Sequence, residues 1–392
     1  MISWGSVGII PSIKRLVRSN SRVLHTDRRV HYKLYGEQAG EPTTVQIWQI
    51  ACRAQAADRK PIRVIVNGRR IVVFRASARA SAGAGGFAAL EDRCAHRNAP
   101  LSLGRVCAGR LVCPYHGWEY DRDGRVTRVP ALSPAESPNS INSESPSPIT
   151  VERFHTLEQD GFVWVAGGDC PPANAPPRFA GMGEPGWTCF TMQTRFRATV
   201  EACLENFLDC PHAAFVHRHW FRTATGEPVR VDVRTLEDGA VAEFFAEPRK
   251  RSLVWWLLAP RRGQMRHTDR FIAPATSRVD YEFPSGLRYV ITSFCTERTA
   301  HETEVFTVIA FRWGWLGPLV RLYFEPLSRY IIQQDVKMLA AQHETITAFG
   351  TAHFVSTRAD VLGRHIVAWR QALKSGSPVP TAGATESVSI HL

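Results

Sequence analysis

Two Cys-His pairs lie close together in the chain, and their side chains are well suited to bind a metal. The first pair is Cys94-Ala-His96, and the second, Cys113-Pro-Tyr-His116, follows after sixteen intervening residues. Thiolate sulfur and imidazole nitrogen together ligate zinc or an iron–sulfur cluster. A zinc site usually has the order Cys-x-x-Cys and then two spaced His. The mixed order here favours an iron–sulfur centre over the alternative of a structural zinc site.

A second group of metal-binding residue types follows in the second half of the chain, where Asp209, His212 and His217 form the pattern Asp-x2-His-x4-His. Two His and one carboxylate make the facial triad of non-haem Fe(II) oxygenases, which leaves open positions on the metal. Residues five apart on a regular α-helix point about 140° apart. We therefore expect a distorted helix here, by a π-turn or because Pro211 disturbs the backbone.

The segment Cys-Pro-Tyr-His-Gly-Trp at 113–118, with the Cys-x-His pair before it, resembles the Rieske domain of ring-hydroxylating and related non-haem iron oxygenases. In a Rieske centre, two His replace two Cys on one of the two irons. The resemblance implies a [2Fe–2S] cluster with four ligands: Cys94, His96, Cys113 and His116. Respiratory-chain Rieske proteins are similar but carry an extra Cys on each loop. The corresponding positions here hold Ala99 and Tyr115, which favours the oxygenase type.

The same resemblance implies that His212 and His217 bind a mononuclear Fe(II) at which O2 is activated. The family supplies the third ligand as an Asp on a late helix, and Asp335 in the segment 328–339 matches that position. The alternatives are His219 in place of His217, and Glu344 or Asp360 in place of Asp335.

Asp209 has a different role in the family, where the Asp three residues before the first iron His is not a ligand. It links that His to a Rieske His of a neighbouring subunit. Carried over, Asp209 joins His212 to His116 of another chain, and a head-to-tail contact that closes makes a ring. The resemblance thus implies a homotrimer. Asn206 is a further candidate for a position near the iron.

Composition limits the class of protein. The chain has 392 residues, 44% hydrophobic residues, a formal net charge of +12 and nine Cys. This length suffices for two or three domains. No basic block is interleaved with aromatic residues, so we do not expect nucleic-acid binding. Scattered Cys and the lack of a run of eighteen apolar residues predict a cytoplasmic protein whose contact with a membrane is unlikely.

The spacing of apolar residues predicts an α+β fold in three segments. Residues 1–44 are a basic helical extension, residues 45–168 a β-rich Rieske domain, and residues 169–392 a catalytic domain that binds the mononuclear iron. The Ser/Pro-rich stretch 133–148 is expected to be a loop inserted in the Rieske domain. The family resemblance implies that the catalytic domain is a helix-grip fold, in which a curved antiparallel sheet wraps a helix around a pocket.

Individual elements follow from local patterns. Asn67-Gly68 between two apolar runs is a strong hairpin signal. The first domain is expected to contain strands at 45–51, 62–66, 71–74, 87–91 and 161–165, and a hairpin at 119–124. The second is expected to contain strands at 229–245, 252–258, 270–283, 287–297 and 302–313, flanked by helices at 199–220 and 325–348. Strands and helices in separate runs favour α+β.

The Gly-rich segment 181–186 matches a dinucleotide fingerprint by letter, but no strand precedes it and Pro185 interrupts it. Electrons are therefore expected from a ferredoxin, from an NAD(P)H-dependent reductase, or from both. The resemblance implies the terminal oxygenase of a Rieske system, of the branch built from α subunits alone. It would oxidise a hydrophobic small molecule, with aromatic residues between 207 and 221 and at 255–256 as candidate pocket residues. The alternative is an electron-transfer protein that only carries a Rieske cluster.

Overall fold

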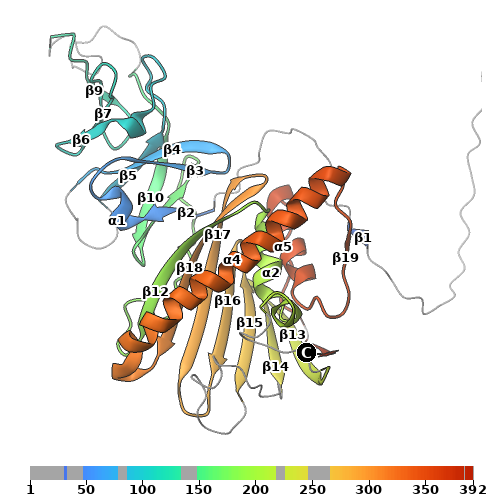
Figure 1. Ribbon diagram of the computed structural model, residues 1–392. Helices are drawn as coiled ribbons and strands as arrows, with labels where there is room; N and C mark the ends of the chain where they lie inside the picture. The colour runs from blue at the N-terminus through green and yellow to red at the C-terminus, as the bar shows by residue number, and fades with distance from the viewer. Residues whose placement is uncertain are drawn as a thin grey trace, which may run out of the picture.

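Antiparallel sheets build both halves of the chain (Figure 1). The computed structural model describes residues 31–32, 47–77, 86–133, 148–217, 226–245, 265–383 and 385–391. Helices are few and lie mostly in the second half, so the α+β class is confirmed. Much of the expected basic extension at 1–44, of the Ser/Pro-rich stretch at 133–148 and of the expected strand at 252–258 lies outside the described residues.

The first half contains two sheets. A six-stranded sheet has the order β2-β11-β10-β5-β4-β3, and a four-stranded sheet has the order β6-β7-β8-β9. The elements are β2 Gln49–Arg53, α1 Ala54–Ala57, β3 Ile62–Val66, β4 Arg69–Arg75, β5 Phe87–Glu91, β6 Arg105–Cys107, β7 Arg110–Val112, β8 Glu119–Tyr120, β9 Val126–Arg128, β10 Arg153–Gln159 and β11 Phe162–Ala166. Asn67 and Gly68 both have positive φ, 49° and 74°, as the predicted hairpin turn requires.

The second half is one eight-stranded sheet in the order β12-β18-β17-β16-β15-β14-β13-β20. Its elements are β12 Thr188–Phe196, α2 Val200–Leu208, β13 Pro228–Leu236, β14 Gly239–Phe245, β15 Arg266–Ile272, β16 Thr276–Glu282, β17 Arg288–Thr299, β18 Glu302–Arg312, α4 Gly317–Phe349, α5 Gly363–Ser375 and β20 Glu386–His391. A short pair, β1 His31–Tyr32 with β19 Phe354–Val355, lies apart from it. Helices α2, α4 and α5 lie on one side of the sheet (Figure 1).

Four expectations for this half need correction. The single strands expected at 229–245 and 270–283 are each a hairpin, because turns at 237–238 and around Pro274 divide them. The helix expected at 199–220 ends at Leu208, and the late helix begins eight residues earlier than expected, at Gly317. Gly317 is required there, because a Cβ at this position would lie 2.0 Å from Thr188 Oγ1 on β12.

The two halves share a core. Trp164 of β11 and Phe294 of β17 pack edge to face at 4.8 Å, and Phe162 contacts Phe306 of β18 in the same way. Polar contacts add to this interface, since Thr296 Oγ1 donates to the carbonyl of Ile50 at 2.9 Å. The tip of the β3–β4 hairpin also donates two backbone N–H groups to β17. These contacts hold the first half against one end of the large sheet.

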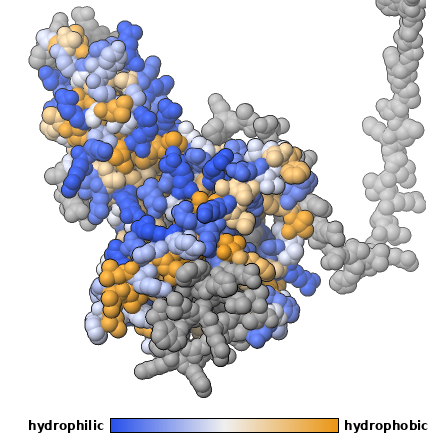
Figure 2. Space-filling view, in the orientation of Figure 1, coloured by the Kyte–Doolittle hydropathy of each residue, from blue (hydrophilic) through white to orange (hydrophobic). Residues whose placement is uncertain are grey.

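Most of the face shown in Figure 2 is hydrophilic, but apolar side chains gather near the start of α4. Trp315, Leu319 and Leu322 are 88%, 65% and 73% exposed, while Phe324 points inward and is buried. Further along α4, Ile331, Asp335 and Leu339 are buried against the sheet.

No helix within the described ranges combines the length and apolar character needed to cross a bilayer.

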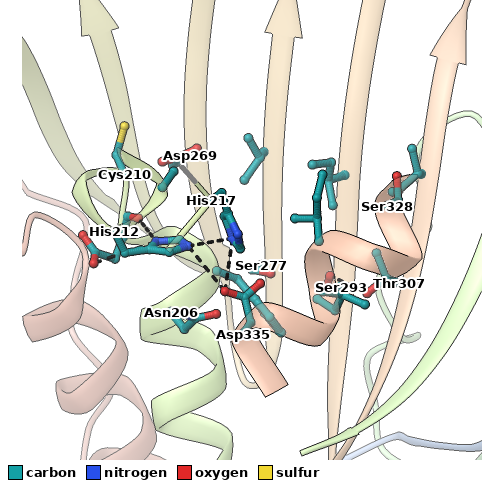
Figure 3. Close-up of a pocket in the computed structure, with 18 of the residues that line it drawn as sticks. Asn206, Cys210, His212, His217, Asp269, Ser277, Ser293, Thr307, Ser328 and Asp335 are labelled. Carbon is teal, nitrogen blue, oxygen red and sulfur yellow. Dashed lines mark hydrogen bonds and ion pairs between the residues drawn. The ribbon is translucent and has the colours of Figure 1, made fainter. Parts of the chain in front are cut away.

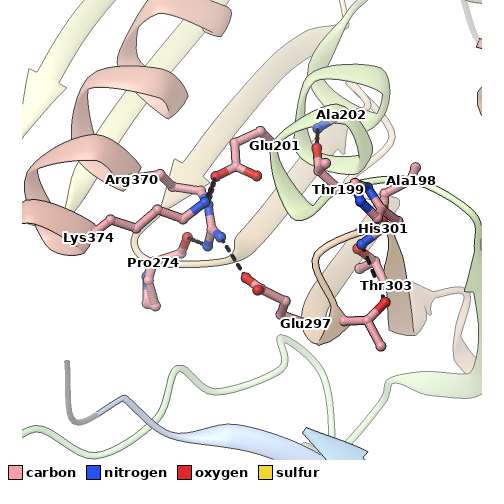
Figure 4. A network of polar contacts seen from close by, with 11 residues as sticks. Ala198, Thr199, Glu201, Ala202, Pro274, Glu297, His301, Thr303, Arg370 and Lys374 are labelled. Carbon is pink, nitrogen blue, oxygen red and sulfur yellow. Dashed lines mark hydrogen bonds and ion pairs between the residues drawn. The ribbon is translucent and has the colours of Figure 1, made fainter. Parts of the chain in front are cut away.

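A network of charged side chains fixes α5 to α2 (Figure 4). Arg370 of α5 donates to Glu201 of α2 at 2.8 Å, to the carbonyl of Pro274 at 3.2 Å and to Glu297 at 3.4 Å. Lys374 donates to the same Glu201 oxygen at 2.8 Å. Burial alone would raise the pKa of Glu201, but the two cations outweigh it and lower the pKa to about 2.

We expect Arg370→Met to destabilise the protein by about 2–3 kcal/mol, because it leaves a buried carboxylate with one partner. Lys374→Met is the matched control and should cost under about 1 kcal/mol, since its side chain is 60% exposed. The folded-state pKa of Glu201 is depressed, so the stabilisation is present above pH 4.5 and is lost as the pH falls towards about 2. Urea unfolding at pH 7 and pH 3 measures both effects. Equal losses from the two substitutions at pH 7 would contradict this account.

Candidate functional site

The two Cys-His loops come together at the four-stranded sheet. Cys94 and Cys113 are 1% and 2% exposed and lie side by side, and the rings of His96 and His116 are 4.6 Å apart. Both thiols are free. The structure thus brings the two buried sulfurs together and the two imidazoles together.

Neighbouring residues fix the shape of these loops. Asp92, whose side chain is fully buried, accepts hydrogen bonds from Ser102 N at 2.6 Å and Ser102 Oγ at 2.8 Å, which ties the two ends of the first loop together. The Tyr120 hydroxyl lies 3.1 Å from Cys94 Sγ and accepts a bond from the amide of Ala95. The indole of Trp118 stacks on His96 at 4.7 Å.

This arrangement fits a [2Fe–2S] cluster. His96 Nδ1 is buried and has no hydrogen-bond partner, which is costly for a polar atom unless a ligand satisfies it. Two thiolates and two imidazoles are the Rieske donor set. The Tyr120 hydroxyl would donate to the Cys94 thiolate, and such bonds to sulfur help to set the cluster's potential.

A second cluster of ligand atoms lies between α2 and α4 (Figure 3). His212 Nε2 and His217 Nε2 are 3.3 Å apart, and Asp335 Oδ1 lies 3.1 Å from His217 Nε2 and 3.7 Å from His212 Nε2. One ligand atom from each residue lies within 4.8 Å of the other two. Ligand atoms bound to one metal at about 2.1 Å are about 3 Å apart. The separations therefore suit a shared ion.

Hydrogen bonds aim both imidazoles at this point. His217 Nδ1–H donates to Gln334 Oε1 at 2.8 Å, and His212 Nδ1–H donates to the main-chain carbonyl of Asp209. In each ring the Nε2 lone pair is therefore directed towards Asp335. Such partners fix the tautomer and the ring orientation of metal-binding His. Asp335 Oδ1 is buried without a hydrogen bond of good geometry, which again fits an ion at this place.

Of the two distortions expected from the spacing of the two His, the backbone shows the one at Pro211 and not a π-turn. Helix α2 ends at Leu208, Asp209 adopts an extended conformation with ψ 96°, and a 3₁₀ helix starts at Pro211. Proline lacks the N–H that a continuing helix needs. His212 therefore lies on the 3₁₀ helix and His217 on the turn that follows it, so the two rings converge without a bulged helix.

The alternative third ligands, Glu344 and Asp360, do not belong to this cluster of ligand atoms. Glu344 is on an exposed face of α4, where its carboxylate is 3.5 Å from Arg197. The Asp360 carboxylate accepts bonds from Thr357 in a turn. His219 lies outside the described residues.

Asp209 is placed beside His212 but not as a member of the triad. Its Oδ2 is 3.9 Å from His212 Nδ1, and its side chain is 38% exposed. Burial, together with the negative charge of Asp360, raises the pKa of Asp209 to about 6. Burial and the same neighbour raise the pKa of Glu205 to about 7. The region around the triad is thus rich in carboxyl groups.

A pocket of about 160 Å³ opens beside the triad. Asn206, the further candidate from the sequence, lines it together with Phe207, and the buried Asn206 Oδ1 has no hydrogen-bond partner. Among the other aromatic candidates, only Phe215 lies within the described residues, and it does not line the pocket. Phe215 is 72% exposed, and residues 220–221 and 255–256 are outside the described ranges.

The strand register arranges the sheet side of the pocket in three rows. One row is aromatic, with His267, Tyr281 and Tyr289; the next is mostly aliphatic, with Asp269, Val279, Ile291 and Ile309; the last carries hydroxyl groups, with Ser277, Ser293 and Thr307. Ser293 and Thr307 hydrogen bond to each other at 2.9 Å. The sequence analysis did not predict this side of the pocket. It expected one continuous strand at 270–283, and so did not include the turn that pairs β15 with β16 and aligns the rows. It also missed Gln334, although that residue directly precedes Asp335.

Comparisons with known proteins support two domain types. The Rieske [2Fe-2S] domain family matches residues 47–145, and the family "Vanillate O-demethylase oxygenase C-terminal domain" matches residues 196–375. Together the two matches contain both Cys-His loops, Asp209 and the His212–His217–Asp335 cluster.

Curated relatives match over part of their length. Methylxanthine N1-demethylase NdmA of Pseudomonas putida is 39% identical over 33% of this chain and 35% of its own length. The vanillate O-demethylase oxygenase subunit of Pseudomonas sp. (strain ATCC 19151) is 31% identical over 47% of this chain and 51% of its own length. The chain thus spans about half or less of these relatives.

Solved structures agree on the fold. Dicamba monooxygenase bound to dicamba superimposes with a TM-score of 0.72 at 20% identity, over 85% of this chain and 98% of that one. At this identity the likeness speaks for the fold alone. The two domain matches contain both groups of ligand residues. The chain therefore combines a Rieske [2Fe-2S] domain with an oxygenase C-terminal domain of the vanillate O-demethylase type.

Proposed function

We propose that this chain is the terminal oxygenase of a multicomponent Rieske system that uses O2 to oxidise a small molecule. The observation that carries the proposal is the convergence of His212, His217 and Asp335 beside a pocket in the C-terminal domain. A protein that only carries electrons needs no such second site. This observation therefore favours an oxygenase over the electron-carrier alternative.

The proposed ligand residues form two separate metal centres. Cys94, His96, Cys113 and His116 would hold the [2Fe–2S] cluster, and His212, His217 and Asp335 would hold one Fe(II). When bound, these groups supply one-electron transfer and the activation of O2 next to the substrate. Gln334 and the Asp209 carbonyl keep the two imidazoles in the ligating orientation. The aliphatic row, with Ile331 and Ile332, excludes water from the pocket.

Partners follow from the same assignment. A ferredoxin or an NAD(P)H-dependent reductase would deliver electrons to the [2Fe–2S] cluster. In Figure 1 the sheet that carries the cluster loops lies at the far end of the first half from α2. This placement favours transfer between neighbouring subunits, and hence the homotrimer, with Asp209 at the contact. The cytoplasmic location stays a prediction.

Metal analysis tests this proposal directly. Protein purified without oxygen should be red-brown and contain about three irons and two acid-labile sulfides per chain, two of the irons belonging to the cluster. The reduced cluster should give a Rieske-type EPR spectrum. Cys113→Ser should remove sulfide but leave the mononuclear iron. One zinc per chain and no sulfide would contradict the cluster assignment, and two irons with no third would leave only an electron carrier.

A further inference from the structure

A groove rich in arginine lies in the first half of the chain, next to the loop that carries Cys94 and His96. Its volume is about 420 Å³. The residues on its two sides come from the β3–β4 hairpin and from this first Cys-His loop with its flanks: Arg63, Arg69 and Arg70 on one side, and Arg93, Asn98 and Pro100 on the other.

Hydrogen bonds connect the wall of the groove to a proposed cluster ligand. The Asn98 N–H donates to the Cys94 carbonyl at 2.9 Å, and the Cys94 N–H donates to the Ala99 carbonyl at 2.9 Å. No residue of the second loop, 113–118, lines the groove. A molecule bound there would therefore lie beside the cluster without occupying the loop of His116, which we propose for the contact with a neighbouring subunit.

Two of the four guanidinium groups are paired with carboxylates of the groove itself. Arg63 donates to Asp92 at 2.6 Å, and the Asp92 side chain is fully buried. Arg93 pairs with Glu91 at 3.0 Å. The charges cancel within each pair, so these four residues shape the groove without giving it a net charge.

The remaining arginines give this surface a positive charge. Arg69 pairs with Glu152, which does not line the groove, and its guanidinium lies over the Phe154 ring at 4.7 Å. Within the described part of the chain, Arg70 forms no ion pair, and neither does Arg97, the residue after His96. Both side chains are exposed. Unpaired surface cations attract a negatively charged partner and speed its approach.

The surroundings favour a protein partner over a nucleic acid. No aromatic side chain lines the groove, so the bases of a single strand would find no surface for stacking. Guanidinium groups bind carboxylates through planar, paired hydrogen bonds. The bonds from the groove wall to Cys94 favour a partner that exchanges electrons with the cluster.

We propose that this groove is the docking site of the electron donor, and that the donor is an acidic protein with carboxylates opposite Arg70 and Arg97. The inference rests on the proposed function and names the kind of partner that supplies its electrons. One electron passes from the reduced donor to the oxidised cluster, so the donor is oxidised, the cluster is reduced, and no bond forms or breaks.

Reduction of the cluster by a plant-type [2Fe–2S] ferredoxin of net negative charge tests the docking site. Such a ferredoxin has a lower potential than a Rieske centre, so the transfer is favourable. Reduced ferredoxin is mixed with the full-length protein without oxygen, and stopped-flow absorbance follows the cluster. Arg70→Glu should lower the second-order rate about tenfold at low salt, since charges at the edge of an interface control association. The difference should shrink at about 0.5 M salt, where charges are screened.

Two controls isolate the groove. Reduction by dithionite, a small molecule that needs no docking surface, should be as fast in Arg70→Glu as in wild type. Arg234→Glu makes the same charge change at an exposed residue of β13 in the second half, and should leave the ferredoxin rate unchanged.

A cross-link gives a readout that does not depend on electron transfer. Arg70→Lys keeps the positive charge and supplies an amine, so the ferredoxin rate should stay at the wild-type value. A carbodiimide should couple this amine to a carboxyl group of the ferredoxin, as peptide mass spectrometry would show. Arg234→Lys should give no such product.

The proposal would be overturned by an unchanged ferredoxin rate in Arg70→Glu, by an equal loss in Arg234→Glu, or by the lack of a cross-link in Arg70→Lys. A wild-type cluster that dithionite reduces and the ferredoxin does not would also contradict it. If Arg70→Glu weakened the binding of a DNA duplex and left the ferredoxin rate unchanged, the groove would be a nucleic-acid site. A failure of the proposed oxygenase function would appear separately, as a missing third iron.

Discussion

Asp335→Ala should lose the mononuclear iron and reduce O2-dependent turnover by more than about a hundredfold. Changes to residues that merely support metal ligands already cost about 10–100-fold. Asp335 offers the only carboxylate oxygen within 4.8 Å of both imidazoles among the described residues. The Rieske EPR signal should be unchanged, because Cys94 and the other cluster ligands lie in the other half of the chain. Iron content, EPR and O2 uptake on one preparation measure all three quantities.

Glu344→Ala is the matched control for that substitution. Glu344 lies on the same helix as Asp335, but its side chain is 66% exposed and is paired only with Arg197 at the surface. Its removal should leave iron and turnover at wild-type values. If Asp335→Ala retained both iron and activity, the third ligand would be another residue.

The local chemistry of this site could be read from the sequence, whereas its long-range geometry could not. Residue types and spacing indicated the two Cys-His pairs and the His212–His217 pattern, since these residues are close in the chain, and the family resemblance assigned them as ligands and favoured His217 over His219. Asp335 is 118 residues beyond His217, and the family resemblance, not spacing, picked it out over Glu344. The structure brings Asp335 to the two His because the face of α4 that carries it is buried against the sheet.

The residues of the pocket wall show more clearly that sequence patterns do not predict contacts between distant segments. His267 and Asp269 stand on a strand whose start the sequence pattern placed four residues too late, at Arg270. Only the register across β14, β15 and β16 puts His267 between Phe244 and Tyr281. Alternation along one strand predicts which face a side chain occupies, but not which neighbours it meets on adjacent strands. The contacts of a pocket residue with adjacent strands are therefore the part of the wall least visible in the sequence.

Asp209→Asn should slow electron transfer between the two centres without removing either of them. Asp209 does not belong to the triad, and its main-chain carbonyl, which holds His212 Nδ1–H, is kept in the variant. The carboxylate is half-exposed next to His212, where it can accept a bond from His116 of a neighbouring subunit. Replacing it with an amide should remove the charge-assisted hydrogen bond that we propose between this carboxylate and His116, and such bonds are about twice as strong as neutral ones.

The measurement is a single turnover followed by EPR and stopped-flow absorbance. Reduced cluster is mixed with O2 and substrate, and we expect reoxidation in Asp209→Asn to be about 10–100-fold slower than in wild type. Asp360→Asn is the control for the loss of a nearby negative charge, because Asp360 lies in a turn with Thr357 and is not one of the triad residues. Both metal centres must be fully occupied in each protein. Reoxidation at the wild-type rate in Asp209→Asn would show that electrons take another route, and a fully active monomer would show that no neighbouring subunit is needed.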